Sequence, residues 1–318
     1  MVEHRRNVLM IGAGRLGMTL SQELVRQRLA GSLFLNTRSV AKLSSCALSL
    51  SVYALTVEST TQVFAGAPPD LGSIDLIVIA VKDDYDPRRL LKRAEFLPSG
   101  MNRDVRTIGF RRDLPLLGDV CRELKGYRGT IAVLTNPVEL MAVAVKRWVP
   151  SAQVVGLGLS VDAARLAFVA TNSGVPTRPV DCPLGGSHMG VSVPLCTRWT
   201  SAAQIRVQSS QQIQRWLTES RKIGPQVVRG LGFSLYDCAA VLAKDLGSLL
   251  QPTLGALSVY ASLATMNDAW GGPIEQVNVN QLRTAPELVS EGELDSIENE
   301  RTSIGFMVAS TRKGSERR

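Results

Sequence analysis

The sequence predicts an α/β fold, with a doubly wound parallel sheet in the first half followed by an α+β domain. Several short runs are almost entirely apolar, among them 74–81 and 130–134, as expected of strands buried on both faces of a parallel sheet. Helical patterns separate these runs. Beyond Ser160 the pattern becomes mixed. With 318 residues and about 150 residues per domain, we expect two domains, 1–150 and 151–318.

The elements of the first half follow in order along the chain. An apolar run at 7–11 leads into a glycine-rich turn at 12–17 and a helix from 18 to about 29, and these form the start of a βαβ unit. The segment 51–57 alternates and is rich in Val and Tyr, so we assign it to a third strand. Further strands are expected at 33–35, 74–81, 130–134 and 153–157, and helices at 112–124 and 139–148.

The second half is less regular. A helix is expected at 162–170, followed by a Gly/Pro-rich region at 174–194. Helical patterns cover 201–217 and 235–250. After Trp270 we expect only a weakly patterned hairpin and a helix at 291–309.

Composition limits the class of protein. Hydrophobic residues make up 45% of the chain and charged residues 20%, which is typical of a globular protein. No apolar run approaches the roughly 20 residues that span a bilayer, so we expect no membrane partner. The five cysteines form no CxxC pair and the chain has two histidines, so we expect neither a metal site nor disulfides and predict a cytoplasmic location.

The net charge of +8 raises the question of nucleic acid. The segments 82–113 and 312–318 each carry a net charge of +3, so most of the excess lies in one internal segment and the tail. Aromatic residues are not interleaved with these charges as base stacking would require. We therefore expect no nucleic-acid partner.

The glycine-rich turn carries the sequence Gly12-Ala13-Gly14-Arg15-Leu16-Gly17 between a predicted strand and a predicted helix. The first glycine permits a tight turn, the second allows close approach of a pyrophosphate, and Gly17 permits close packing of helix and strand. The helix N-terminus then faces the anion. In this context the motif predicts a dinucleotide-binding Rossmann domain; the alternative is a glycine turn that binds nothing.

The end of the next strand bears on the choice of cofactor. An NAD site usually has an acidic residue there that binds the ribose 2′-hydroxyl. Here the chain has Thr37, Arg38 and Ser39 instead. A guanidinium can bind a 2′-phosphate in a bidentate manner, so we predict NADP(H), with NAD(H) possible. The alternative for Arg38 is a solvated loop arginine.

Four further segments carry a resemblance. They are Arg111-Arg112-Asp113-Leu114, Asn136-Pro137-Val138, Asp162-Ala163-Ala164-Arg165, and Gly186-Ser187-His188 followed by Val193-Pro194. In this order, behind the glycine motif, they resemble the motifs of the lactate/malate dehydrogenase family over about residues 7–265. The resemblance implies hydride transfer between a nicotinamide cofactor and a 2-oxo/2-hydroxy acid, in a homodimer or homotetramer.

The resemblance also implies roles for individual residues. His188 would deliver the proton to the substrate carbonyl, a step that suits histidine chemically. Asp162 would fix the imidazole tautomer, and Arg165 would bind the substrate carboxylate. Without the resemblance, the alternative for His188 is a structural or surface histidine. The alternative for Asp162 and Arg165 is an ordinary ion pair one helical turn apart.

Two more residues are implied by the same family. Asn136, at the carboxyl end of a predicted strand, would bind the substrate oxygen; the alternative is an Asn-Pro turn. Arg111 would polarise the carbonyl from a mobile loop, although Arg112 is an alternative and an arginine before a helix is often just solvated.

The sequence departs from the family at two places. The segment 82–111 is longer than the family's specificity loop and carries Arg88, Arg89, Arg103 and Arg106, which could meet an acidic group or form a solvated insertion. Gly232 falls where a small hydroxyl residue is common, which suggests a bulkier substrate. The open alternatives are a reductase of another keto or imine intermediate and a dinucleotide-binding regulator without catalysis.

Overall fold

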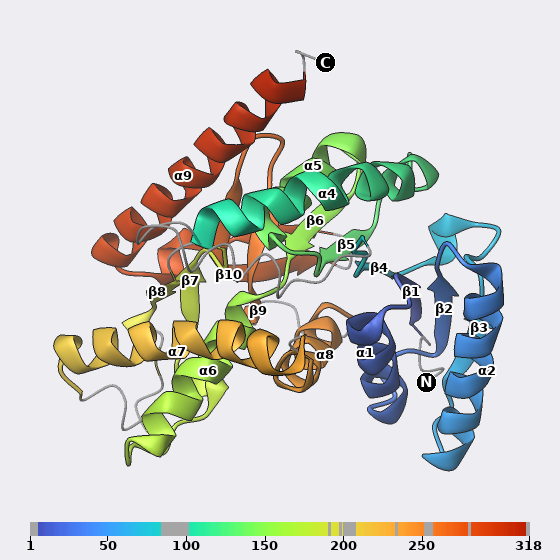
Figure 1. Cartoon of the computed structure of the whole chain (residues 1–318), viewed down its shortest axis with the longest axis horizontal. Coiled ribbons are helices and arrows are strands. Elements are labelled where there is room, and N and C mark those ends of the chain that lie inside the picture. Colours follow the sequence, from blue (N-terminus) through green and yellow to red (C-terminus); the bar gives the residue numbers. More distant parts are fainter. Residues whose placement is uncertain are drawn as a thin grey trace.

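The computed structural model describes residues 6–83, 102–189, 192–196, 199, 208–232, 235–250, 257–278 and 281–315. Its centre is a nine-stranded sheet with the strand order β11-β10-β9-β6-β5-β4-β1-β2-β3 (Figure 1). Strands β1 to β6 are parallel, and β9 to β11 add antiparallel neighbours at one edge. The strands are β1 (Asn7–Ile11), β2 (Ser32–Asn36), β3 (Gln62–Ala65), β4 (Leu76–Ile79), β5 (Thr130–Val133), β6 (Gln153–Gly156), β9 (Leu257–Ala264), β10 (Ala269–Asn278) and β11 (Gln281–Thr284). The predicted doubly wound, mostly parallel sheet is confirmed.

Helices cover both faces of the sheet. Buried residues of α1, α2 and α8 pack on one face, and those of α4, α5 and α9 pack on the other. A separate cluster joins α6, α7 and β7, which pairs with the short strand β8. The bounds are α1 (Arg15–Arg26), α2 (Val40–Thr56), α4 (Asn102–Glu123), α5 (Val138–Trp148), α6 (Leu159–Asn172), β7 (Leu184–Gly186), β8 (Ser192–Pro194), α7 (Ser210–Leu231), α8 (Tyr236–Leu250) and α9 (Glu291–Ser315). In Figure 1, α9, α4 and α5 lie above the sheet, whereas α6, α7 and α8 lie below it.

The predicted strand at 51–57 is wrong, because these residues form the end of helix α2. Ser39 caps this helix by accepting from the backbone N–H of Lys42 at 3.3 Å. The buried residues Ala47, Leu50 and Ala54 recur at helical spacing. The Ser51 hydroxyl donates to the Ala47 carbonyl four residues earlier at 2.9 Å. The true third strand, β3, is short and mostly exposed, so it gives little signal in the sequence.

The C-terminal part joins the same sheet. Strand β9 pairs antiparallel with β6, so the sheet continues across the predicted division between 1–150 and 151–318, and that division stays a prediction. The weakly patterned hairpin is β9–β10, and the predicted helix at 291–309 lies within α9. Helix α7 begins at Ser210 rather than at residue 201, and residues 201–207 lie outside the described part.

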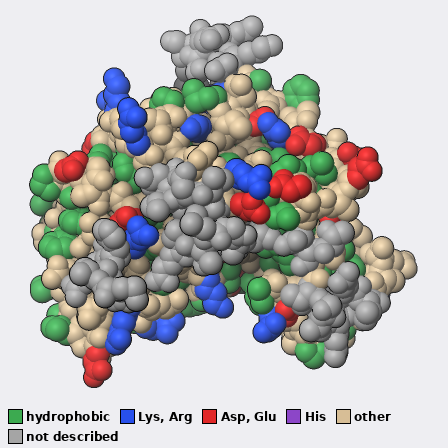
Figure 2. Space-filling model, turned by 180° about the vertical axis from the view of Figure 1, so that it is seen from behind, with side chains coloured by type: hydrophobic (Ala, Val, Ile, Leu, Met, Phe, Trp, Pro, Cys, Tyr) green, Lys and Arg blue, Asp and Glu red, His purple; other side chains and the backbone are tan. Residues whose placement is uncertain are grey.

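Side-chain charge is spread over the surface. Figure 2 shows lysine, arginine and acidic side chains interspersed on one face, with apolar side chains between them. The basic residues Arg88 and Arg89, and most of the tail 312–318, lie outside the described residues or have undescribed side chains. Among the described helices, none is both long and apolar enough to cross a membrane.

Candidate active site

The glycine turn joins β1 to α1, and its glycines have different surroundings. Gly12 has φ +112°, and a Cβ there would lie 2.4 Å from the carbonyl oxygen of Ala80. A Cβ on Gly17 would lie 1.9 Å from the carbonyl oxygen of Gly12. No atom lies within 4 Å of the Cβ position of Gly14. Two glycines are therefore required by close backbone packing, and the third faces open space at a helix N-terminus, which fits an approaching pyrophosphate.

The neighbours Arg15 and Leu16 open helix α1. Leu16 is partly buried and packs against the core beside the sheet. Arg15 is exposed.

The end of β2 presents the three residues predicted to select the cofactor. Thr37 is half-buried, whereas Arg38 and Ser39 are exposed. The carbonyl of Asn36 accepts from the backbone N–H of Gly12 at 2.9 Å, so this strand end lies beside the glycine turn. The Ser39 hydroxyl accepts from Lys42 as the helix cap and keeps its own proton for donation.

His188 lies in the turn between β7 and β8. Its Nδ1 is 2.8 Å from Oδ2 of Asp162, and its side chain is 10% exposed. A donor at Nδ1 fixes the tautomer, so Nε2 is the nitrogen that exchanges a proton. The structure thus brings together two residues that are 26 positions apart in the sequence.

Asp162 lies in the first turn of α6, where the helix dipole stabilises a carboxylate. Besides the imidazole, its Oδ2 accepts from the Ser192 hydroxyl at 3.2 Å. Arg221 of α7 donates to the backbone oxygen of Ser192 at 3.2 Å. Oδ1 of Asp162 lies 3.7 Å from Nη1 of Arg165. The carboxylate is therefore shared between an imidazole and a guanidinium.

Two further residues hold the imidazole in place. The backbone N–H of His188 donates to Oε1 of the fully buried Glu139 at 2.7 Å. The Ser262 hydroxyl donates to the same oxygen at 3.2 Å. A Cβ on Gly158 would lie 2.6 Å from Cγ of the His188 ring. The imidazole is therefore fixed from three sides: by Asp162 at the ring, by Glu139 at the backbone, and by the bare backbone of Gly158.

Arg165 has a partner that the sequence did not predict. Its Nη2 lies 2.8 Å from Oδ2 of Asp237 in the first turn of α8, and its Nε donates to the same oxygen at 3.2 Å. Burial acts to lower the pKa of Arg165, but Asp162, Cys238 and Asp237 outweigh it and raise that pKa above its ordinary value. The guanidinium stays charged.

Asn136 and Arg111 are not joined to this cluster by any described contact. Asn136 is exposed at the carboxyl end of β5 and precedes Pro137 across a cis peptide bond. Arg111 is exposed within helix α4, not in a loop. The neighbouring Asp113 is 1% exposed and accepts from the backbone N–H of Asp83 at 2.7 Å, so it holds the chain at Asp83. That segment, with Arg88 and Arg89, lies outside the described residues.

Glu139 and Asp237 were missed, for different reasons. Glu139 directly follows the Asn136-Pro137-Val138 segment at the start of an apolar helix, and an isolated carboxylate there was an available signal. Asp237 lies in the first turn of a helix, where an acidic residue is ordinary. Only the tertiary packing of α8 against α6 brings it to Arg165.

Gly232 has a backbone role that accounts for its identity. It ends α7 in the left-handed conformation with φ +81°, and its N–H donates to the Val228 carbonyl at 2.8 Å. Glycine is the residue favoured at such a helix end. This glycine therefore does not by itself indicate an enlarged pocket.

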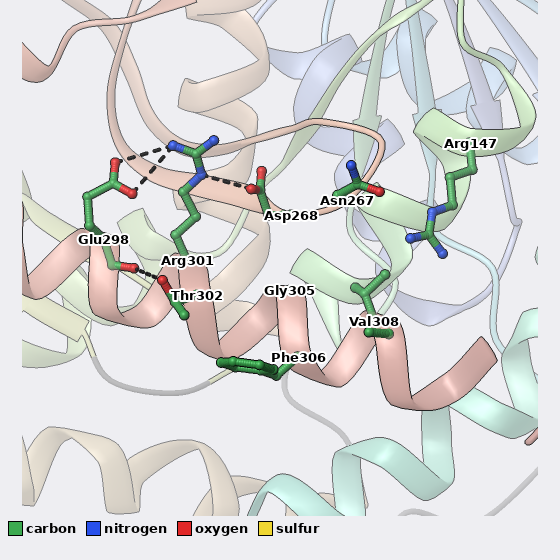
Figure 3. Close-up of a pocket in the computed structure, with 10 residues that line it drawn as sticks. Arg147, Asn267, Asp268, Glu298, Arg301, Thr302, Gly305, Phe306 and Val308 are labelled. Atoms are coloured by element: carbon green, nitrogen blue, oxygen red, sulfur yellow. Dashed lines mark hydrogen bonds and ion pairs between the residues drawn. The ribbon is translucent and has the colours of Figure 1, made fainter. Parts of the chain in front are cut away.

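A pocket of about 500 Å³ lies elsewhere, between the end of α5, the β9–β10 turn and α9. Figure 3 shows Arg301 directed toward Asp268 and Glu298, with Arg147 on the opposite side. The Arg301 Nε lies 3.0 Å from Asp268. None of the predicted site residues lines this pocket. Among the described residues, no cluster of three or more potential metal ligands occurs.

The cluster around His188 has the parts required for acid–base chemistry beside a bound anion. An imidazole oriented by a carboxylate can give or take a proton. A buried guanidinium offers paired donors of fixed geometry.

Comparisons with known proteins agree with this geometry. The chain is 23% identical over 269 residues to L-lactate dehydrogenase 1 of Enterococcus faecalis, covering 84% of this chain and 75% of that protein. It is 24% identical over 242 residues to malate dehydrogenase of Thermoplasma acidophilum, covering 71% and 69%. No protein-family model matches the chain.

Solved structures extend the similarity to the whole fold. Malate dehydrogenase from Archaeoglobus fulgidus in complex with NADH superimposes with a TM-score of 0.75 at 16% identity, over 96% of this chain and 99% of that one. The resemblance found in the sequence motifs is confirmed: the chain is similar in sequence, at low identity, to lactate and malate dehydrogenases, and its fold is similar to that of a solved malate dehydrogenase.

Proposed function

We propose that the chain is an oxidoreductase that transfers a hydride between a nicotinamide dinucleotide and C2 of a 2-oxo/2-hydroxy acid. One observation carries the proposal: His188, Asp162 and Arg165 form one cluster, with the imidazole 2.8 Å from the carboxylate and the guanidinium 3.7 Å from it. The relatives named above are lactate and malate dehydrogenases, which supports the same chemistry here.

Each residue of the cluster has a defined task in this reaction. His188 donates a proton from Nε2 to the carbonyl oxygen during reduction and takes it back during oxidation. Asp162 keeps the other ring nitrogen protonated and stabilises the imidazolium. Arg165 binds the carboxylate end of the substrate. Asn136 and Arg111 complete the proposal as residues that bind and polarise the carbonyl oxygen.

The glycine turn fits a nicotinamide dinucleotide. Gly14 faces open space at the N-terminus of α1, and backbone N–H groups there can bind a pyrophosphate. The bound cofactor supplies or accepts the hydride. Arg38 is exposed beside the turn and makes no hydrogen bond or ion pair to another described residue. It supports the proposal that NADP(H) is preferred to NAD(H), because a guanidinium can bind the 2′-phosphate.

The finer assignments rest on the sequence alone. The long segment 82–111 supports a substrate that is bulkier than lactate or malate. A homodimer or homotetramer is proposed from the resemblance, and a cytoplasmic location is proposed from the pattern of cysteines.

The test follows NADPH and NADH oxidation in parallel against 2-oxo acids of increasing side-chain size. We expect turnover that is faster with NADPH, and we expect R38A to reduce this preference at least tenfold. Equal rates with both cofactors would refute the role of Arg38 but not the chemistry. Absence of cofactor oxidation across the panel, with cofactor still bound, would refute the proposed activity.

A variant separates catalysis from binding. H188N should lower kcat about 10²–10⁴-fold while the Kd of the reduced cofactor, measured by fluorescence titration, stays unchanged. His4 is the other histidine of the chain and is not one of the predicted site residues, so H4N is the matched control. Equal loss of turnover and cofactor affinity in H188N would indicate a structural histidine.

A further inference from the structure

Arg165 is already engaged by a carboxylate of the chain itself. One oxygen of Asp237 accepts from Nε at 3.2 Å and lies 2.8 Å from Nη2. These two nitrogens form one edge of the planar guanidinium, an edge that carboxylates commonly bind. A substrate carboxylate on this edge would have to take the place of Asp237 or lie against it.

The remaining sides of the guanidinium are also closed in. Asp162 lies 3.7 Å from Nη1, and a Cβ on Gly224 of α7 would lie 2.9 Å from the same nitrogen. The side chain of Arg165 is 12% exposed, whereas that of Asp237 is 30% exposed. The guanidinium is therefore held within the protein, and the carboxylate of Asp237 is the more accessible partner.

The net charge of the cluster also disfavours the binding of a further carboxylate. With a neutral imidazole, the guanidinium and the two carboxylates sum to −1, and with an imidazolium they sum to 0. Without Asp237 the two sums would be 0 and +1, and the second would balance an anionic substrate. In either state Asp237 lowers the net charge that a substrate carboxylate meets by one unit and is itself a like charge beside it, which is a general way of rejecting a ligand.

We propose that Asp237 is a specificity-determining residue: it competes with a substrate carboxylate for Arg165, so that the site accepts a 2-oxo compound ending in an uncharged carboxamide at least as well as the corresponding acid. This inference rests on the proposed function, because it concerns the same site. A carboxamide suits the pair chemically, since its oxygen accepts from the guanidinium and its N–H donates to the carboxylate of Asp237. A carboxylate has no proton to donate and is repelled by the same group.

The experiment compares pyruvate with its neutral amide, pyruvamide. Both are titrated by calorimetry into the full chain bound to the oxidised cofactor, so that no hydride transfer takes place. We expect the wild type to bind pyruvamide at least as tightly as pyruvate. D237N keeps a hydrogen-bonding oxygen at Arg165 but removes the charge, so it should bind pyruvate at least tenfold more tightly than the wild type does.

The matched control is E219Q. Glu219 lies on α7, is half exposed, and pairs with Lys222 at 2.6 Å, so E219Q removes one negative charge without touching Arg165. It should bind both ligands as the wild type does. D237S removes the carboxylate without putting an amide in its place and should show the same gain in pyruvate affinity. It shows whether the result for D237N is specific to asparagine.

Unchanged pyruvate affinity in D237N and D237S would overturn the proposal. It would also be overturned by a wild type that prefers pyruvate over pyruvamide tenfold, or by pyruvate failing to bind these variants. The proposed function is tested separately, by oxidation of the reduced cofactor. A gain in pyruvate binding by the variants without turnover would support the role of Asp237 and refute the activity. Turnover, with equal pyruvate affinities in the wild type and the variants, would support the activity and refute the role of Asp237.

Discussion

Asp245 of α8 is a buried carboxylate whose cost to stability should depend on pH. It is 8% exposed, and its Oδ1 accepts from the Ser160 hydroxyl at 3.0 Å. Its Oδ2 has no hydrogen-bond partner among the described residues. Burial raises the pKa of Asp245 from 3.8 to about 7, against the smaller opposing effects of Ser160 and Lys244. The folded state therefore binds this proton more tightly than the unfolded chain does.

The sign and size of the effect follow from linkage. A raised carboxyl pKa contributes no loss of stability below about pH 4, and the loss accumulates as the pH rises toward 7. Each unit of pKa difference corresponds to about 1.4 kcal/mol, so the cost approaches about 4 kcal/mol above pH 7. Of this, about 2–3 kcal/mol should appear between about pH 5 and pH 8. D245N cannot ionise and avoids that cost.

The assay is urea unfolding of the wild type and D245N at several pH values. The difference in free energy of unfolding between the two proteins should shift toward D245N by about 2–3 kcal/mol from about pH 5 to pH 8. Asp295 on α9 is exposed, and D295N is the control for loss of a carboxylate. A difference for D245N that stays constant with pH would refute the reasoning, because it would mean that Asp245 ionises as easily in the folded state as in the unfolded chain.

Three substitutions around the imidazole test how His188 is held. D162N should lower kcat about 10²–10⁴-fold, because the Nδ1 hydrogen bond of 2.8 Å fixes the tautomer, with cofactor Kd by fluorescence unchanged; a loss of affinity alone would contradict this. G158A places a methyl group 2.6 Å from the ring, so steady-state kinetics should show a fall in kcat with the fold retained by circular dichroism, and normal turnover would show that the ring adapts. E139A leaves the N–H of His188 without its acceptor at 2.7 Å and should lower the free energy of unfolding by about 1–3 kcal/mol. The control S262A removes only the 3.2 Å bond to Glu139, so an equal loss in both variants would assign the effect to Ser262.

The sequence predicted those parts of the fold that local patterns determine. The buried strands β4 and β5 are continuous apolar runs, and the glycine turn is a local motif between β1 and α1, although the contact that requires Gly12 is made with Ala80 after β4. The segment 51–57 predicts a strand because apolar and polar residues alternate over these few positions and Val and Tyr are frequent, although the segment is helical. Its helical stripe of buried residues, Ala47, Leu50 and Ala54, extends beyond that window.

The site residues that belong to short sequence motifs could be predicted. His188, Asp162 and Arg165 were singled out from short segments, and the structure places them in one cluster. Glu139 and Asp237 act through contacts made by distant elements, at sequence separations of 49 and 72 residues. The contact of Asp237 leaves no periodic or motif signal, because it depends on where α8 packs. The only signal of Glu139 is that it is an isolated carboxylate at the start of an apolar helix.

Helix α8 contributes two carboxylates that contact α6, one of them at the His188 cluster. It contributes Asp237 to Arg165 and Asp245 to Ser160, so two of its carboxylates face α6. Eight residues of helix separate them by about 12 Å, a distance at which independent sites have additive effects within about 0.5 kcal/mol. D237N should therefore change ligand affinity and D245N the pH dependence of stability, each without the other. The double variant tests this by unfolding and calorimetry: additive effects are expected, whereas a coupling above about 1 kcal/mol would mean that α8 shifts as a unit against α6 when either carboxylate is neutralised.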